Sequence, residues 1–347
     1  MKTMRTSRGI SRKILSLMFI LVFGSVLAGC GSSEDSSNSE GSSGSTPDEV
    51  VIGYFPNINH VAGMVAEKKE MYKQALPDGT KVSFKYFPDG SAFMTALETG
   101  EIQGGLVGPG PAMNHYVSGA DINVVAAGST GGTVIMKRNG SGIESPEDLK
   151  GKTFVSPRVG CTHDVQFETL MKREYGITSE RIDGEMKHVT GKPATYSSLF
   201  ASKQVDVATV PEPWASVIEE KGNGKVLVDT KDVAFGKTLP AAVYVTSQDL
   251  AKNNPDFVQK LVDAHKKATK FIQDNPDEAK TIAINKIKEI TDQKLSQSVV
   301  DNAWDRIDFT YDVKTSDLQS FADASYDLKF LDEKPDLEGL VKRDFIK

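Results

Sequence analysis

The sequence predicts an α/β protein with two lobes, each built on a β-sheet covered by helices, and a helical C-terminal part. From 50 to about 228, short apolar runs alternate with amphipathic segments, which is the pattern of strand–helix units around a parallel sheet. The stretches 97–112 and 200–215 also share one order of features: helix end, turn, strand, Pro-rich loop and helix start. This echo predicts two similar lobes facing a shared cleft, although two ordinary strand–helix units would give the same pattern by coincidence.

The first residues are typical of a targeting segment. Residues 1–29 hold five basic and no acidic side chains, and the largely apolar run 14–27 is too short for a confident membrane span. The run ends in Leu-Ala-Gly-Cys, which is similar to a bacterial lipobox, so we expect cleavage before Cys30 and acylation of Cys30. An ordinary signal peptide with an incidental cysteine is the alternative.

Residues 30–47 are expected to form a disordered tether, because Ser, Gly and acidic residues leave almost no apolar surface to bury. A lipid followed by a tether predicts a protein held on the extracytoplasmic face of a cell membrane. Removing 1–29 would take the formal charge from −6 to −11, which argues against nucleic acid as a partner. Only Cys161 remains beside Cys30, so no disulfide within the chain is expected.

The elements follow in order. In the first lobe we expect strands at 50–55, 81–87, 102–107 and 122–127, with helices at 61–73 and 91–99 and a short helix from Pro111. In the second lobe we expect strands at 153–155, 186–189, 205–210 and 226–228, with helices after 161, at 194–202 and after 213. A strand at 242–245 returns to the first lobe, and helices follow at 255–272, 276–290, 296–304 and 315–328. Ligands on such sheets bind at the carboxyl ends of strands, which directs attention to the loops 56–60, 108–111 and 129–133.

The stretch 154–172 carries the sharpest functional signal. A strand end passes through Pro157 and Gly160 into a helix that Thr162 or Asp164 can cap. Unpaired backbone N–H groups and the helix dipole at such a start suit an anion. The stretch therefore predicts half of a binding site for a small oxyanion.

Several longer motifs resemble one known family. They are VVIGYFPNINHVAGMVAEKK, ALETGEIQGGLVGPGPAMN, SPEDLKGKTFVSP, the GCTHD loop, VPEPWASVIEEKGNGKVLVD and FTYDV. Together they resemble the extracytoplasmic binding proteins of ABC importers for aliphatic sulfonates, taurine and nitrate. The family pattern at the loop is closer to Gly-Asn-Thr-Gln-Asp, so Cys161 and His163 are departures that bear on the ligand.

The resemblance implies a fold and a role. The fold is a two-lobed clamshell of the type II periplasmic-binding class with two hinge crossovers. One lobe would hold 48–135 with 241–347, and the other 136–240. The protein would be a monomeric carrier without cofactor, metal or catalytic residues, delivering a small anion to a membrane permease and its ATPase.

The expected site combines opposed amides with a few side chains. N–H groups of 162–164 would face those of 130–132, and the hydroxyls of Ser129, Thr130 and Thr162 would add donors, unless these residues only cap helices. Including the loops at strand ends, the predicted ligand-binding residues are Asn57, His60, Gly108, Pro109, Ser129, Thr130, Gly131, Cys161, Thr162, His163, Asp164, Glu212 and Trp214.

Other side chains admit two interpretations. Trp214, Tyr54 and Phe55 would cover an organic tail or pack in the core, and Glu212 would accept from loop N–H groups or face a ligand amine. His60 and His163 lack the spacing of a metal site, and His163 is the better candidate for a donor to the anion. His115, His188 and His265 are expected on the surface or on helix faces.

An enzyme is the main alternative class. Cys161 lies two residues before His163, but side chains two residues apart on a helix do not face each other. A cysteine that only fills space is the simpler interpretation. No nucleophile elbow, Walker loop or zinc signature is present in the sequence. Among ligands, an organic sulfonate or taurine is favoured over nitrate, bicarbonate or a vitamin-precursor heterocycle, because Trp214 and its neighbours suit a tail.

Overall fold

A computed structural model describes residues 47–347, and its first strand begins at Glu49. The predicted signal segment, the acylation of Cys30 and nearly all of the tether lie outside the described residues. Within 47–347, no helix is both long enough and apolar enough to cross a membrane.

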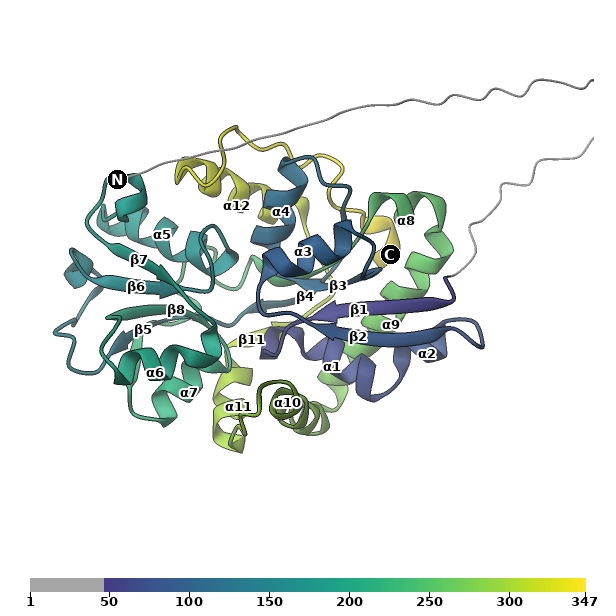
Figure 1. The fold of residues 1–347 in the computed structure, drawn as a ribbon, viewed down its shortest axis with the longest axis horizontal. Helices are drawn as coiled ribbons and strands as arrows, with labels where there is room; N and C mark the ends of the chain where they lie inside the picture. The colour runs from purple at the N-terminus through teal and green to yellow at the C-terminus, as the bar shows by residue number, and fades with distance from the viewer. Residues whose placement is uncertain (1–46) are drawn as a thin grey trace, which may run out of the picture. The chain divides into compact units, whose positions relative to one another are not determined.

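Eleven strands and twelve α-helices make up the described chain (Figure 1). The strands are β1 (Glu49–Tyr54), β2 (Lys81–Tyr86), β3 (Gly104–Val107), β4 (Asn123–Gly131), β5 (Thr133–Arg138), β6 (Thr153–Ser156), β7 (Lys187–Thr190), β8 (Val207–Pro211), β9 (Gly224–Val228), β10 (Pro240–Thr246) and β11 (Ile307–Phe309). The helices are α1 (Val61–Lys68), α2 (Met71–Ala75), α3 (Gly90–Glu98), α4 (Pro109–Val117), α5 (Thr162–Tyr175), α6 (Tyr196–Ala201), α7 (Trp214–Glu220), α8 (Gln248–Asn253), α9 (Pro255–Asp274), α10 (Pro276–Thr291), α11 (Gln297–Asp305) and α12 (Thr315–Asp327). Short 3₁₀ turns are η1 (Ile58–His60), η2 (Pro146–Leu149), η3 (Glu180–Ile182), η4 (Pro193–Thr195) and η5 (Arg343–Ile346).

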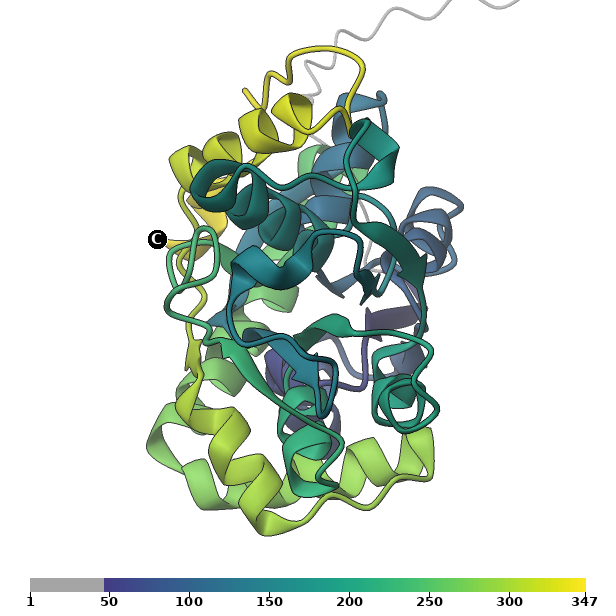
Figure 2. The same ribbon diagram turned by 90° about the vertical axis from the view of Figure 1, so that its left-hand side faces the viewer.

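The strands form two sheets. The first has the order β11-β4-β10-β3-β1-β2 and the second the order β7-β6-β8-β5-β9. We call the part of the described chain built on the first sheet lobe 1 and the part built on the second sheet lobe 2. Figure 2, turned by 90°, brings the elements of the second sheet toward the viewer.

The chain passes between the sheets twice. Gly132 alone separates β4 of the first sheet from β5 of the second, and residues 229–239 lead back from β9 to β10. The returning strands run against their neighbours: β10 is antiparallel to β3 and β4, and β5 is antiparallel to β8 and β9. The parallel arrangement predicted for the strand–helix units holds for β1 with β2 and β3 and for β6 with β7 and β8. The strands β5 and β10 are antiparallel to their neighbours, because a strand that enters from the other lobe has no helical crossover to set it parallel.

The predicted α/β class is confirmed. Both faces of the first sheet are buried, since Val125 and Ala126 of β4 pack with α1 and α9 while Val124 and Ala127 pack with α3 and α12. Two-sided burial of this kind gives the continuous apolar runs that marked these strands in the sequence. The predicted lobe boundary at 135 falls inside β5, and the assignment of residues to lobes at those boundaries stays a prediction.

Some local expectations differ from the structure. The predicted helix 61–73 is two helices, because Glu70 takes a left-handed conformation (φ 53°) between α1 and α2. Helix α8 and strand β11 were not foreseen, and β11 is too short for a clear alternating pattern. His265 was expected on the surface or on a helix face; it lies on α9, but on its buried face, within hydrogen-bond distance of the Ala127 carbonyl (2.7 Å).

Candidate functional site

A cavity of about 560 Å³ lies between the two lobes, a size typical of small-ligand sites. Loops and helix starts at strand ends form its wall, as expected for α/β sheets. Its lining comprises Phe55, Pro56, Asn57, Asn59, His60, Tyr86, Phe87, Pro88, Asp89, Gly90, Ser91, Gly108, Pro111, Asn114, His115, Pro157, Arg158, Val159, Gly160, Cys161, Thr162, His163, Lys192, Pro193, Ala194, Pro211, Trp214, Ala241, Ile290, Thr291 and Gln293.

The start of α5 opens at this cavity. Cys161 is the N-cap residue, and no side chain caps the helix, so its first turn lacks the usual side-chain acceptor for its N–H groups. The prediction that Thr162 or Asp164 caps this helix was wrong. The Thr162 hydroxyl accepts from the Gly110 amide of α4 (3.1 Å), and Asp164 Oδ2 accepts from the Gly160 amide (2.8 Å).

The start of α4 packs directly against the start of α5. A Cβ at Gly108 would lie 2.7 Å from Thr162 Oγ1, and one at Gly110 would lie 2.7 Å from the Thr162 amide nitrogen, so both glycines permit this approach. Asn114, one turn further along α4, donates from Nδ2 to the Gly160 carbonyl (3.1 Å). These contacts tie lobe 1 to lobe 2 directly beside the cavity.

Two histidines and one cysteine lie in the wall as neutral groups at pH 7. Burial lowers the pKa of His60 to about 3, with a further contribution from His163, and lowers the pKa of His163 to about 4. Burial also raises the pKa of the Cys161 thiol to about 12. Each neutral imidazole can still donate one hydrogen bond, whereas Cys161 carries no thiolate.

Charge at the cavity comes from residues that the sequence analysis did not select. Arg158 lines the wall with a half-exposed side chain, and its Nη1 lies 3.6 Å from Asp89, which caps α3. Lys192 lines the wall from lobe 2. Arg158 belongs to the same loop as the predicted anion site, so its place in the sequence could have identified it as a cavity residue.

Aromatic residues form part of the wall. Trp214, at the start of α7, and Phe55, at the end of β1, both line the cavity, and Phe55 stacks on Phe93 (centroids 5.9 Å). Tyr54 does not line it, because its side chain is fully buried and its hydroxyl donates to Glu67. The core interpretation therefore holds for Tyr54.

Seven of the thirteen predicted ligand-binding residues line the cavity and six do not. The six outside the lining are Pro109, Ser129, Thr130, Gly131, Asp164 and Glu212. The polar groups of segment 129–132 have other hydrogen-bond partners. The Ser129 hydroxyl donates to the Asn59 carbonyl, and the Gly132 amide donates to the Arg306 carbonyl (2.9 Å). The expectation of amides from 130–132 facing those of 162–164 was therefore wrong, because sheet pairing with β11 takes up this segment.

Glu212 also serves the connection between the lobes. Its buried carboxylate accepts from Arg306 Nη1 (2.5 Å) and from the Ser216 amide and hydroxyl. Arg306 follows α11 and also pairs with Glu219 (3.1 Å) and Asp229 (3.4 Å) of lobe 2. The charge of Glu212 is thus matched by Arg306 rather than by a ligand amine.

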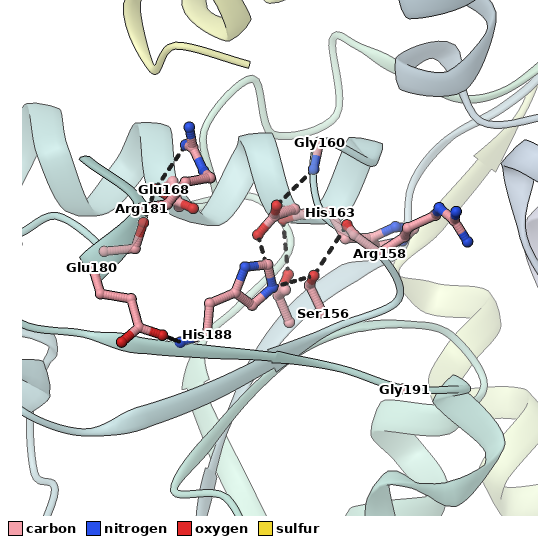
Figure 3. Close-up of polar contacts among 12 residues, drawn as sticks. Ser156, Arg158, Gly160, His163, Glu168, Glu180, Arg181, His188 and Gly191 are labelled. Atoms are coloured by element: carbon pink, nitrogen blue, oxygen red, sulfur yellow. Dashed lines mark hydrogen bonds and ion pairs between the residues drawn. The ribbon is translucent and has the colours of Figure 1, made fainter. Parts of the chain in front are cut away.

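A buried polar cluster lies behind the start of α5. Figure 3 shows His188 between Ser156 and the Glu168–Arg181 pair. Asp164, Glu168 and His188 each present an atom within 4.8 Å of the other two, a spacing that could hold a metal ion. Arg181, 3.4 Å from Glu168, and the positive end of α5 already supply positive charge there, which opposes a cation. Burial, with Glu168 nearby, raises the pKa of Asp164 well above its usual value. Burial also lowers the pKa of His188 to about 4. The His188 side chain is buried on strand β7, so the prediction of a surface or helix-face position was wrong for this residue.

A family model described as NMT1-like matches residues 43–286. The chain belongs to the NMT1-like family. A Brucella abortus protein named as a binding protein is 28% identical over 260 residues, covering 72% of this chain and 76% of that protein. A Bacillus subtilis protein named for binding aliphatic sulfonates is 24% identical, covering 97% and 96% of the two chains.

A solved structure is similar over most of the chain. The alkanesulfonate-binding protein SsuA of Xanthomonas axonopodis pv. citri, bound to MOPS, gives a TM-score of 0.73 at 21% identity, covering 86% of this chain and all of that one. This member of the NMT1-like family therefore has the two-lobed α/β fold of periplasmic binding proteins.

Proposed function

We propose that this protein is the extracytoplasmic solute-binding component of an ABC importer that captures a small organic oxyanion, an aliphatic sulfonate or taurine. It holds the anion between the lobes and presents it to a membrane permease driven by a separate ATPase. It works as a monomer without cofactor, anchored through acylated Cys30. The names of its relatives support this role.

One observation carries the proposal: the uncapped start of α5 opens at a cavity between the lobes. Backbone N–H groups at a helix start attract an oxyanion, and each end contributes about 0.3–1 kcal/mol, more when water is excluded. Neutral His163 can add an N–H donor, and Arg158 lies in the same wall. The Thr162 hydroxyl accepts from the Gly110 amide, and its own proton can still be donated to the anion.

The apolar part of the wall favours an anion with an organic tail. Trp214, Phe55, Phe87 and Ile290 line the same cavity as the polar groups. Nitrate or bicarbonate would leave this surface in contact with water, whereas the carbon chain of a sulfonate would cover part of it. The apolar wall therefore supports an organic sulfonate.

The protonation state of the Cys161 thiol favours a carrier over a hydrolase. The thiolate is the reactive form, and burial holds the pKa of this thiol near 12. His163 is itself neutral, with its pKa lowered to about 4, so no adjacent imidazolium stabilises a thiolate. Cys161 is instead a small side chain in a crowded loop.

Binding is coupled to closure of the lobes. The chain passes between the lobes only at Gly132 and at 229–239, which leaves few backbone segments to bend. A ligand that touches both lobes stabilises the closed state and shifts the population toward it. Asn114 and Thr162 then join the lobes next to the ligand.

Isothermal titration with ethanesulfonate, taurine, nitrate and bicarbonate tests the proposal. We expect saturable 1:1 binding of at least one sulfonate. The NMR spectrum of that sulfonate should be unchanged after prolonged incubation with the protein. Binding of nitrate or bicarbonate alone would reject the organic tail. Turnover that disappears in Cys161→Ser would instead show an enzyme.

A further inference from the structure

The segment between β6 and α5 is held in place by side chains that do not line the cavity. Its residues 157–160 all line the cavity, and Cys161, Thr162 and His163 follow directly. The position of this loop therefore decides where the start of α5 points. Two hydrogen bonds from side chains of lobe 2, one near each end, contribute to holding it.

The first hydrogen bond is at Arg158. The Ser156 hydroxyl donates to the Arg158 carbonyl (3.2 Å) and lies 2.7 Å from His188 Nε2. When the Ser156 proton is donated to the Arg158 carbonyl, Ser156 accepts from His188, and the imidazole proton is then on Nε2. The His188 ring is held in turn by stacking on Phe154 at 4.3 Å with 7° between the planes.

The second hydrogen bond is at Gly160. Its amide donates to Asp164 Oδ2 (2.8 Å), while Asp164 Oδ1 lies 3.4 Å from His188 Nε2. His188 thus contacts the donor of the first hydrogen bond, Ser156, and the acceptor of the second, Asp164. Figure 3 shows His188, Ser156 and Gly160 close together. The side chains of His188 and Asp164 are 5% and 0% exposed, so water does not compete for these contacts.

We propose that Ser156, Asp164 and His188 are positioning residues for ligand binding, acting through the loop 157–160. Gly160 adopts φ +71°, and its carbonyl accepts from Asn114 of lobe 1. The same residue is therefore held by lobe 2 at its amide and by lobe 1 at its carbonyl. A shift of Gly160 moves the start of α5 and breaks the Asn114 contact. The effect on affinity rests on the proposed function, whereas the effect on the loop does not.

The test compares His188→Leu with His188→Gln in the full chain. Leucine removes the Nε2–H donor, whereas the glutamine amide can replace it. Leu170→Ala is the matched control, because it removes a buried side chain from the same helix without touching the loop. Two readouts are taken well below each melting temperature: the iodoacetamide labelling rate of Cys161, resolved from Cys30 by peptide mass spectrometry, and the Kd for ethanesulfonate.

We expect His188→Leu to speed labelling of Cys161 at least tenfold and to weaken ethanesulfonate binding about tenfold. His188→Gln should stay within about twofold of the wild type on both readouts, and Leu170→Ala should lower only the melting temperature. Ser156→Ala removes the same support of Arg158 with a smaller change, and it replaces His188→Leu if that variant does not fold.

Wild-type labelling in His188→Leu, or equal labelling in His188→Leu and His188→Gln, would overturn the proposal. Faster labelling with unchanged ethanesulfonate affinity would also overturn it, because the loop would then be held without effect on the ligand. A wild type that binds no sulfonate would reject the proposed function, while Cys161 labelling would still decide whether these residues hold the loop.

Discussion

The substitution Gly110→Ala should leave the stability of the fold nearly unchanged while it weakens closure of the two lobes. Gly110 lies in α4 with an ordinary helical backbone, where alanine is favoured over glycine by about 0.5–1 kcal/mol. Across the lobe boundary, however, the new Cβ would lie 2.7 Å from the Thr162 amide nitrogen and 3.1 Å from the Cys161 carbonyl carbon. Those atoms belong to the backbone and cannot rotate away.

The size of the effect follows from two losses. Crowding at a packed contact costs about 1–3 kcal/mol. Separation of α4 from α5 also removes the Gly110–Thr162 hydrogen bond, worth about 0.5–1.5 kcal/mol. Closure should therefore be weakened by about 3 kcal/mol, which raises the Kd about 150-fold. The free energy of unfolding without ligand should change by less than about 1 kcal/mol.

Calorimetry with the sulfonate that the wild type binds measures the affinity, and denaturant unfolding without ligand measures stability. Thr95→Ala, on an exposed position of α3, is the control for a gain in helix propensity away from the lobe boundary. An affinity within threefold of the wild type would refute the reasoning, because the contact between α4 and α5 would then not belong to the bound state.

Three further outcomes are expected. Arg158→Ala should weaken sulfonate binding about three- to tenfold, more at low salt, while the exposed Arg173→Ala on α5 should leave the Kd unchanged in the same titration. Burial lowers the pKa of His265 to about 4, so the unfolded chain binds a proton below pH 6.5 that the folded chain does not. The free energy of unfolding should therefore fall by about 2 kcal/mol per such histidine between pH 7 and 5, and denaturant curves should show a smaller fall in His265→Gln. Arg306→Met should lower the melting temperature by several degrees, because it leaves the Glu212 carboxylate buried without its cation, and Glu212→Gln in the same background should restore part of the loss.

The fold was predictable because its strands and helices carry strong local signals. Both faces of the first sheet are buried, so strands such as β4 appear as apolar runs, and Asn-Pro pairs mark the starts of α9 and α10. The direction of β5 and β10 was not predictable in the same way. It depends on which lobe the chain has just left, and nothing in the residues of β5 or β10 records that.

The candidate site was only partly predictable, for a related reason. The loop before α5 was found because a Pro, a Gly and a helix start lie together in the sequence. Its partner in lobe 1 was predicted to be 129–132, whereas in the structure it is α4, through Gly110 and Asn114. Hydroxyls at 129 and 130 suggested donors, but whether a hydroxyl is free depends on sheet pairing that the local sequence does not show.

The charge balance of the chain bears on how an anion could be selected. Acidic residues exceed basic ones, so the field of the whole protein repels an anion, but salt screens that field within about 8–10 Å. Close to the cavity the balance is different. Glu212, the buried carboxylate in the loop before Trp214, is neutralised by Arg306 and lies outside the cavity lining. Within the lining, Asp89 lies 3.6 Å from Arg158, and Lys192 and the start of α5 add positive charge. Selection should therefore be set by the local donors, with ionic strength changing the association rate more than the ranking of ligands.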